Sequence, residues 1–111
     1  MKNFNSLKKN NDFLKVYQTR RSYANNLLVM YVLKKEDDEI SRVGISVSKK
    51  VGNSVIRHRF ARIIRECFRI TEKEYKYPAD IVVVARVKAA GKGYKEINEA
   101  YINLCKKHGL I

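Results

Sequence analysis

An amphipathic helix is predicted for the middle of the chain, where residues 52–70 read GNSVIRHRFARIIRECFRI. Gly52 and Asn53 interrupt the pattern that precedes them, and an Asn at this position caps a helix start. On a helical projection, the apolar side chains gather within about 120° of one another. They are Ile56, Phe60, Ile63, Ile64, Cys67 and Ile70. We expect this face to pack on the core of the domain.

The opposite face of the predicted helix is cationic. It carries His58, Arg62, Arg65 and Arg69, with Arg57 and Arg59 on either side. Same-sign charges at this spacing destabilise a helix, and Glu66 offsets only one of them. An ordinary solvated face would mix the two signs, whereas arginine without lysine matches the forked geometry that binds phosphate. A nucleic-acid surface is the favoured interpretation. A helix lying on a membrane is a weaker one, because the apolar face is needed for the core.

The net charge points the same way. The 111 residues include 24 Lys and Arg against 11 Asp and Glu, a net charge of +13. Residues 42–69 supply +7 of it, from eight basic side chains and one acidic. A small protein this basic attracts polyanions, so nucleic acid is the expected partner. Lys49 and Lys50, beside the N–H groups of the helix start, form a second and weaker anion site.

The length and the cysteine content of the chain further limit the class of protein to which it can belong. The chain has room for one domain, residues 1–111, with one hydrophobic core. The longest apolar run, residues 27–33, is too short to span a membrane, and the first residues lack the apolar stretch of a signal peptide. Cys67 and Cys105 form no C-x-x-C motif. We therefore expect buried thiols without a disulfide partner, no membrane, and a cytoplasmic location.

The remaining pattern predicts an α+β fold, a small α-β sandwich with the order α-β-β-β-α-β-α. Strands or edge segments are expected at residues 22–26, 27–33, 42–48 and 80–87. Asn10, Asn11 and Asp12 are expected to cap a first helix near residues 13–17. A final helix has the apolar stripe Tyr94, Ile97, Tyr101, Leu104 and Cys105. The acidic residues 36–39 predict a turn rather than a metal site, because consecutive carboxylates point in different directions.

Residues 46–66, SVSKKVGNSVIRHRFARIIRE, closely resemble the signature of the bacterial ribonuclease P protein subunit. Further matches follow in the expected order at residues 7–10, 12–13, 24–25 and 80–86. The resemblance implies an α-β sandwich of a ribosomal-protein type, with a left-handed βαβ crossover against the usual right-handed rule.

The resemblance also implies the partners. They are ribonuclease P RNA, which is the catalytic subunit, and precursor tRNA, from which the holoenzyme removes the 5′ leader by endonucleolytic cleavage. The chemistry and its Mg²⁺ are then expected in the RNA. The polypeptide is expected to bind no cofactor or metal by itself and to contribute no catalytic residue.

Two surfaces are assigned by this correspondence. The residues that would bind the leader are Phe13, Tyr17, Tyr31, Arg57, His58 and Arg65. Those that would face the catalytic RNA are Lys49, Lys50, Asn53, Arg59, Arg62 and Arg69. Single-stranded RNA is held by aromatic platforms beside a basic groove, so the residue types suit the assignment.

Some alternatives stay open at this stage. The family usually has Asn where His58 stands and Lys where Ala61 stands, which adds a titratable ring and removes a cation. Phe13, Tyr17 and Tyr31 suit core packing as well as leader contact. His108 is predicted to be solvated. The alternative function is that of a structural RNA-binding protein of the ribosomal type without an enzymatic partner.

Overall fold

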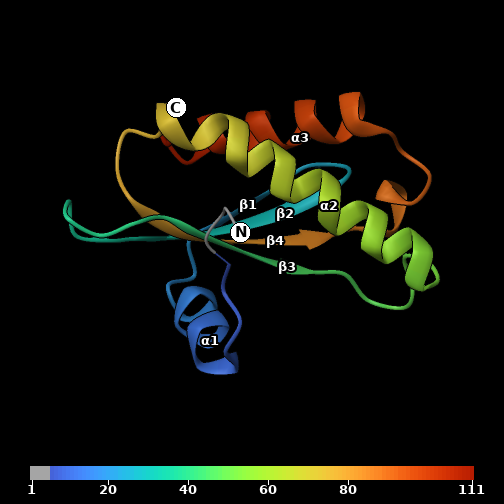
Figure 1. Cartoon of the computed structure of the whole chain (residues 1–111), viewed down its shortest axis with the longest axis horizontal. Coiled ribbons are helices and arrows are strands. Elements are labelled where there is room, and N and C mark those ends of the chain that lie inside the picture. The colour runs from blue at the N-terminus through green and yellow to red at the C-terminus, as the bar shows by residue number, and fades with distance from the viewer. Residues whose placement is uncertain (1–5) are drawn as a thin grey trace.

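A four-stranded sheet separates one helix from the other two (Figure 1). The structure is a computed structural model that describes residues 6–111. Its helices and strands are α1 (Asn10–Gln18), β1 (Ser22–Ala24), β2 (Leu28–Lys34), β3 (Arg42–Ser46), α2 (Ser54–Thr71), β4 (Ala79–Ala85) and α3 (Tyr94–Lys107). Two short 3₁₀ turns, η1 (Glu72–Glu74) and η2 (Val87–Ala89), flank β4. The α+β fold and the predicted order of elements are confirmed.

The sheet is mixed, with the strand order β1-β2-β4-β3. β2 runs antiparallel to β4, and β3 runs parallel to it. β4 lies inside the sheet, as its continuous apolar run predicts. Because β3 and β4 are parallel neighbours, the chain between them must cross over a face of the sheet, and α2 makes that crossing.

Helices α2 and α3 cover one face of the sheet, and α1 lies on the other (Figure 1). The larger core is under α2 and α3 and includes the fully buried Phe68 and Tyr101. The smaller core is under α1, where Val16 and Val82 are buried. One short helix covers this second face, and the aromatic side chains around it are only half-buried. This incomplete cover positions the candidate site.

Helix α2 begins where the sequence predicts. Asn53 is its N-cap, and the Oδ1 atom accepts a hydrogen bond from the Ile56 N–H at 3.0 Å. At the C-terminal end of α2, the buried face differs from the prediction, because Phe68 is buried and Ile70 is 39% exposed. The Phe68 ring packs edge-on against Tyr75. The placement of Ile70 in the core is therefore wrong, because the end of α2 packs toward α3 as well as onto the sheet.

His108, predicted to be solvated, is buried, so that prediction is also wrong. Its Nε2–H donates to the Met30 carbonyl at 2.9 Å, and the ring of Tyr23 packs edge-on against the imidazole. The chain after α3 folds back on the domain, where the Leu110 carbonyl accepts from the Lys76 N–H at 2.6 Å. This return buries a histidine that lies near the end of the sequence.

Several element boundaries also differ. Asn10, Asn11 and Asp12 lie in the first turn of α1 and do not cap it, because the N-cap is Lys9. Tyr94 is 40% exposed, since it is the first residue of α3 and faces α2 instead of the sheet. β3 and β4 each end two residues earlier than predicted.

Candidate nucleic-acid interface

The aromatic side chains predicted to bind RNA gather on the α1 face of the sheet. Gly44 of β3 leaves a gap there that the Phe13 ring fills, because a Cβ added at Gly44 would lie 2.7 Å from Phe13 Cζ. Tyr17 meets Tyr31 edge-on, with ring centroids 4.8 Å apart. Tyr31 and Gly44 both pair with Val82 of β4, so they occupy one row across the sheet. The structure thus brings Phe13, Tyr17 and Tyr31 together.

A groove leads from these rings over β3 to α2. One cavity of about 420 Å³ is lined in part by Phe13, Tyr17 and Ile45. A second, of about 210 Å³, is lined in part by Phe13, Ile45, Ala61 and Arg65. Since Phe13 and Ile45 line both, the two cavities adjoin and carry an aromatic surface at one end and a guanidinium at the other. We call these five residues the aromatic groove.

Arg57 continues the α2 side of this groove. Arg57, Ala61 and Arg65 are spaced four residues apart, so they lie on one side of the helix. The Arg57 Nε–H donates to the Gly52 carbonyl at 3.2 Å, which holds its guanidinium near the helix start. Ala61 lines the second cavity between these two arginine positions. His58 is exposed one position further around α2 and is not among the residues that line either cavity of the groove.

The other arginines of α2 face away from the aromatic groove. Arg59 and Arg62 line a cavity between α2 and the start of α3. Arg69 is held by Glu66, whose two carboxylate oxygens accept from its Nε and Nη2 at 2.9 and 2.6 Å. This pairing lowers the pKa of Glu66. Both partners are exposed, so breaking the pair costs little free energy.

A third basic surface lies in the loops at the end of the sheet. Lys49 and Lys50 are exposed just before α2, and Asn53 uses its side-chain oxygen for the cap. Lys50 lines a cavity of about 400 Å³ together with Arg86 and Lys88, and no acidic side chain lines it. Arg86 and Lys88 are not among the binding residues predicted from the sequence. The feature of the sequence that could have indicated them is a pair of cations, one on each side of Val87, directly after a strand.

The acidic side chains near these surfaces are engaged in ion pairs. Asp80, with 4% of its surface exposed, accepts from Lys35 at 3.2 Å and from Arg42 at 2.7 Å. Arg42 also pairs with Asp12, and the hydrogen bonds that Arg42 donates to Asp80 raise the pKa of Arg42. Within residues 6–111, no three His, Cys, Asp or Glu side chains converge as a metal site requires. These carboxylates stabilise the fold.

The two cysteines are buried thiols. Burial raises the pKa of Cys67 and of Cys105 to about 12, so neither forms the thiolate that a nucleophile requires at neutral pH. In the part of the chain that the structure describes, no helix combines the length and the apolar character needed to cross a lipid bilayer.

Known proteins are similar to this chain in sequence and in fold. Residues 1–109 match the family model described as Ribonuclease P. The chain is 51% identical over 106 residues to the ribonuclease P protein component of Lachnoclostridium phytofermentans, covering 96% of this chain and 90% of that one. It is 49% identical over 111 residues to the ribonuclease P protein component of Clostridium novyi, covering 99% and 98%.

Solved structures extend the likeness to three dimensions. The RNase P protein of Staphylococcus aureus is similar with a TM-score of 0.86 at 34% identity, covering 97% of this chain and 98% of that one. The RNase P protein of Thermotoga maritima is similar with a TM-score of 0.81 at 29% identity, covering 92% and 96%.

Proposed function

The chain belongs to the bacterial ribonuclease P protein family, and on that premise we propose that it binds both the catalytic RNA and the 5′ leader of precursor tRNA. It is the protein component of an endoribonuclease that has an RNA partner. We assign one surface of the protein to each of these two RNAs. Family membership favours it over a structural role of the ribosomal type.

The aromatic groove is the surface we assign to the leader. The observation that carries this assignment is the position of Phe13, which lines both adjoining cavities between the Tyr17 ring and the Arg65 side chain. Single-stranded RNA exposes base faces and a charged backbone, and the groove offers an aromatic surface and a guanidinium side by side. Arg57 lies one helical turn beyond Ala61 and extends the cationic side. Tyr31 of β2 packs edge-on against Tyr17 of α1 and so fixes the position of the Tyr17 ring.

The cations outside the groove are assigned to the catalytic RNA. They are Lys49, Lys50, Arg59, Arg62 and Arg69, with Asn53 at the helix start, and we add Arg86 and Lys88. These side chains lie on faces of α2 and on loops away from the aromatic groove, so two RNA segments can be held at once. His58 stands between the two surfaces on α2, and we keep it with the leader set, as the family resemblance implies.

The reaction itself is assigned to the RNA. The carboxylates of Asp12, Glu66 and Asp80 are held in ion pairs with arginine or lysine side chains. We therefore propose that Mg²⁺ reaches the scissile phosphate through RNA ligands and that the polypeptide positions the leader. Two reduced, buried thiols suit the cytoplasmic location that we propose for the complex.

Reconstitution tests the proposal. The protein is mixed with bacterial ribonuclease P RNA at low Mg²⁺, and release of the 5′ leader from precursor tRNA is measured. We expect the protein to restore cleavage that the RNA alone does not support at that Mg²⁺ concentration, and the protein alone to cleave nothing. A failure to restore cleavage contradicts the proposed function. Cleavage by the RNA-free protein contradicts the assignment of the chemistry.

A further inference from the structure

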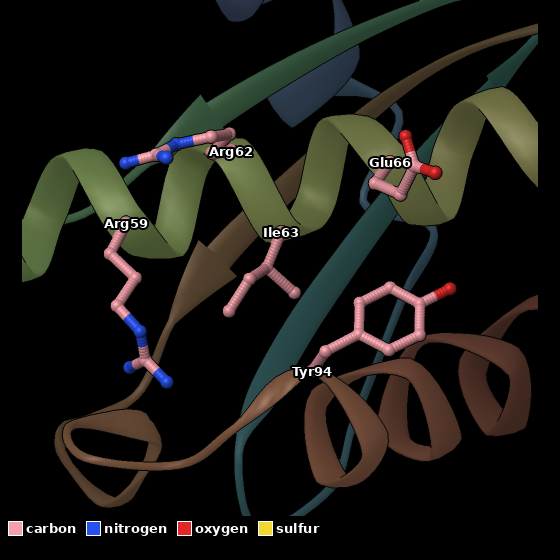
Figure 2. Close-up of a pocket in the computed structure, with 5 residues that line it drawn as sticks. All are labelled: Arg59, Arg62, Ile63, Glu66 and Tyr94. Atoms are coloured by element: carbon pink, nitrogen blue, oxygen red, sulfur yellow. The ribbon is translucent and has the colours of Figure 1, made fainter.

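A cavity of about 480 Å³ lies on the side of α2 that faces α3. Figure 2 shows Ile63 of α2 and the Tyr94 ring at the start of α3 extending into the space between the two helices, with Arg59 on the same side. Arg62 and Glu66 complete the lining. The volume falls within the range of about 300–1,000 Å³ that is typical of sites for small organic groups.

The floor of this cavity is apolar and open to solvent. Tyr94 is 40% exposed, although the other residues of its stripe on α3, such as Ile97 and Tyr101, are almost fully buried. Ile63 is half-buried. An aromatic face and an aliphatic side chain are thus left in contact with water.

The rim of the cavity is cationic. The Arg59 Nη1–H donates to the Lys92 carbonyl at 3.1 Å, which holds this guanidinium beside the cavity. The acidic side chain in the lining, Glu66, is occupied by Arg69. Within residues 6–111, neither Arg59 nor Arg62 forms an ion pair. No carboxylate of this part of the chain is paired with either guanidinium group, so both can bind an anionic ligand.

We propose that this cavity binds one unstacked nucleotide of the catalytic RNA, with its base on the ring of Tyr94 and its neighbouring phosphates on Arg59 and Arg62. A base offers a flat π-face to an aromatic ring, and the phosphates beside it match the forked guanidinium donors. The site lies on the opposite side of α2 from the aromatic groove, so leader and nucleotide do not compete. This inference rests on the proposed function, since it names a further contact to the same RNA partner.

Binding of the full-length protein to ribonuclease P RNA, measured across a salt series, tests the site. Tyr94→Ala removes the ring, and we expect affinity to fall by roughly tenfold, the loss expected for one stacked base. The slope of log affinity against log salt should not change, because stacking releases no counterions. Tyr94→Phe keeps the ring and should bind like the wild type. Ile40→Ala, which trims an exposed apolar side chain beside the acidic turn, serves as the control.

The outcomes separate the site from the function. If the wild type binds the RNA and Tyr94→Ala binds equally well while still folded by thermal melting, the nucleotide site is wrong and the proposed function stands. The same result is expected if the cavity instead binds a protein. If the wild type itself fails to bind the RNA, the proposed function is wrong. For direct placement, a photoreactive phenylalanine analogue at position 94 should cross-link to an unpaired nucleotide, and cross-links confined to helical RNA would overturn the proposal.

Discussion

The ring of Phe13 occupies the space that a side chain on Gly44 would fill. A Cβ built on Gly44 would lie 2.7 Å from Phe13 Cζ and 3.1 Å from Leu7 Cβ. Phe13 in turn lines both cavities of the aromatic groove. One missing side chain on β3 therefore decides how deep the ring of α1 sits and where the groove has its aromatic wall.

Gly44→Ala should displace Phe13 and destabilise the domain. Overpacking of a tight contact costs about 1–3 kcal/mol, and here the obstruction is a ring anchored on a helix. We expect a lower midpoint of urea denaturation with an unchanged m-value, together with weaker binding of leader-containing substrate. Phe13→Leu in the same chain should relieve the clash, so the two substitutions together should cost less than the sum of each alone. Strictly additive effects would show that the two residues do not compete for space.

Arg65→Ala should weaken binding of precursor tRNA to the reconstituted holoenzyme more than binding of mature tRNA. Arg65 lies at the cationic end of the aromatic groove, and the mature tRNA has no leader to occupy it. Loss of a hydrogen bond to a charged group corresponds to roughly a tenfold loss of affinity. Arg59→Ala is the matched control, because it removes the same side chain from another side of α2 and should affect the two substrates equally. Equal losses for Arg65→Ala would place this residue on the catalytic RNA.

The salt dependence of binding to the catalytic RNA should distinguish paired from unpaired arginines. Arg62→Ala is expected to flatten the slope of log affinity against log salt by about 0.7–0.9, the value for one phosphate contact. Glu66→Gln should steepen it by a similar amount, because Arg69 then loses the carboxylate that holds it. Urea denaturation is expected to show only a small change for Glu66→Gln, since the pair is exposed. An unchanged slope for Glu66→Gln would mean that Arg69 does not reach the RNA.

The order of elements and the helix that carries the arginines could be predicted because both depend on local patterns. Asn53 as a cap, the strand alternation around Val43 and the apolar run of β4 each follow from neighbouring residues. The two faces of α2 could be predicted for the same reason. The structure places Arg65 on the aromatic groove and Arg59 and Arg62 on the α3 side. Which RNA each surface binds stays a prediction of the family resemblance.

What could not be predicted depends on how elements pack. Periodicity places Ile70 on the apolar stripe of α2, but it contains no information on where α3 lies, and α3 decides that Phe68 is buried instead. The exposure of Tyr94 has the same origin. The basic cavity of Lys50, Arg86 and Lys88 joins two loops about 36 residues apart in sequence. No local pattern indicates that these loops meet at one end of the sheet.

The burial of His108 should make the stability of the domain depend on pH. Desolvation is the main cause that lowers the pKa of His108 below its ordinary value of 6.5, and the nearby charge of Arg21 lowers it further, while the bond to the Met30 carbonyl opposes them. Among residues 6–111, the buried Nδ1 atom has no hydrogen-bond partner, so an N–H formed there would lack an acceptor. The unfolded chain therefore takes up a proton at higher pH than the folded protein does. Stability is complete above about pH 6.5 and falls as the pH drops toward the lower folded-state pKa.

His108→Gln isolates this contribution. Glutamine keeps a donor for the Met30 carbonyl but does not titrate. Urea denaturation at pH 7.5 and at pH 5.5 should show a larger loss of unfolding free energy for the wild type than for His108→Gln. The variant is expected to be less stable at pH 7.5 because its side chain packs less well against Tyr23, so the comparison uses the difference between the two pH values. Every other titrating group is shared by both proteins, and parallel pH profiles would therefore show that His108 takes up its proton equally well in the folded and unfolded states.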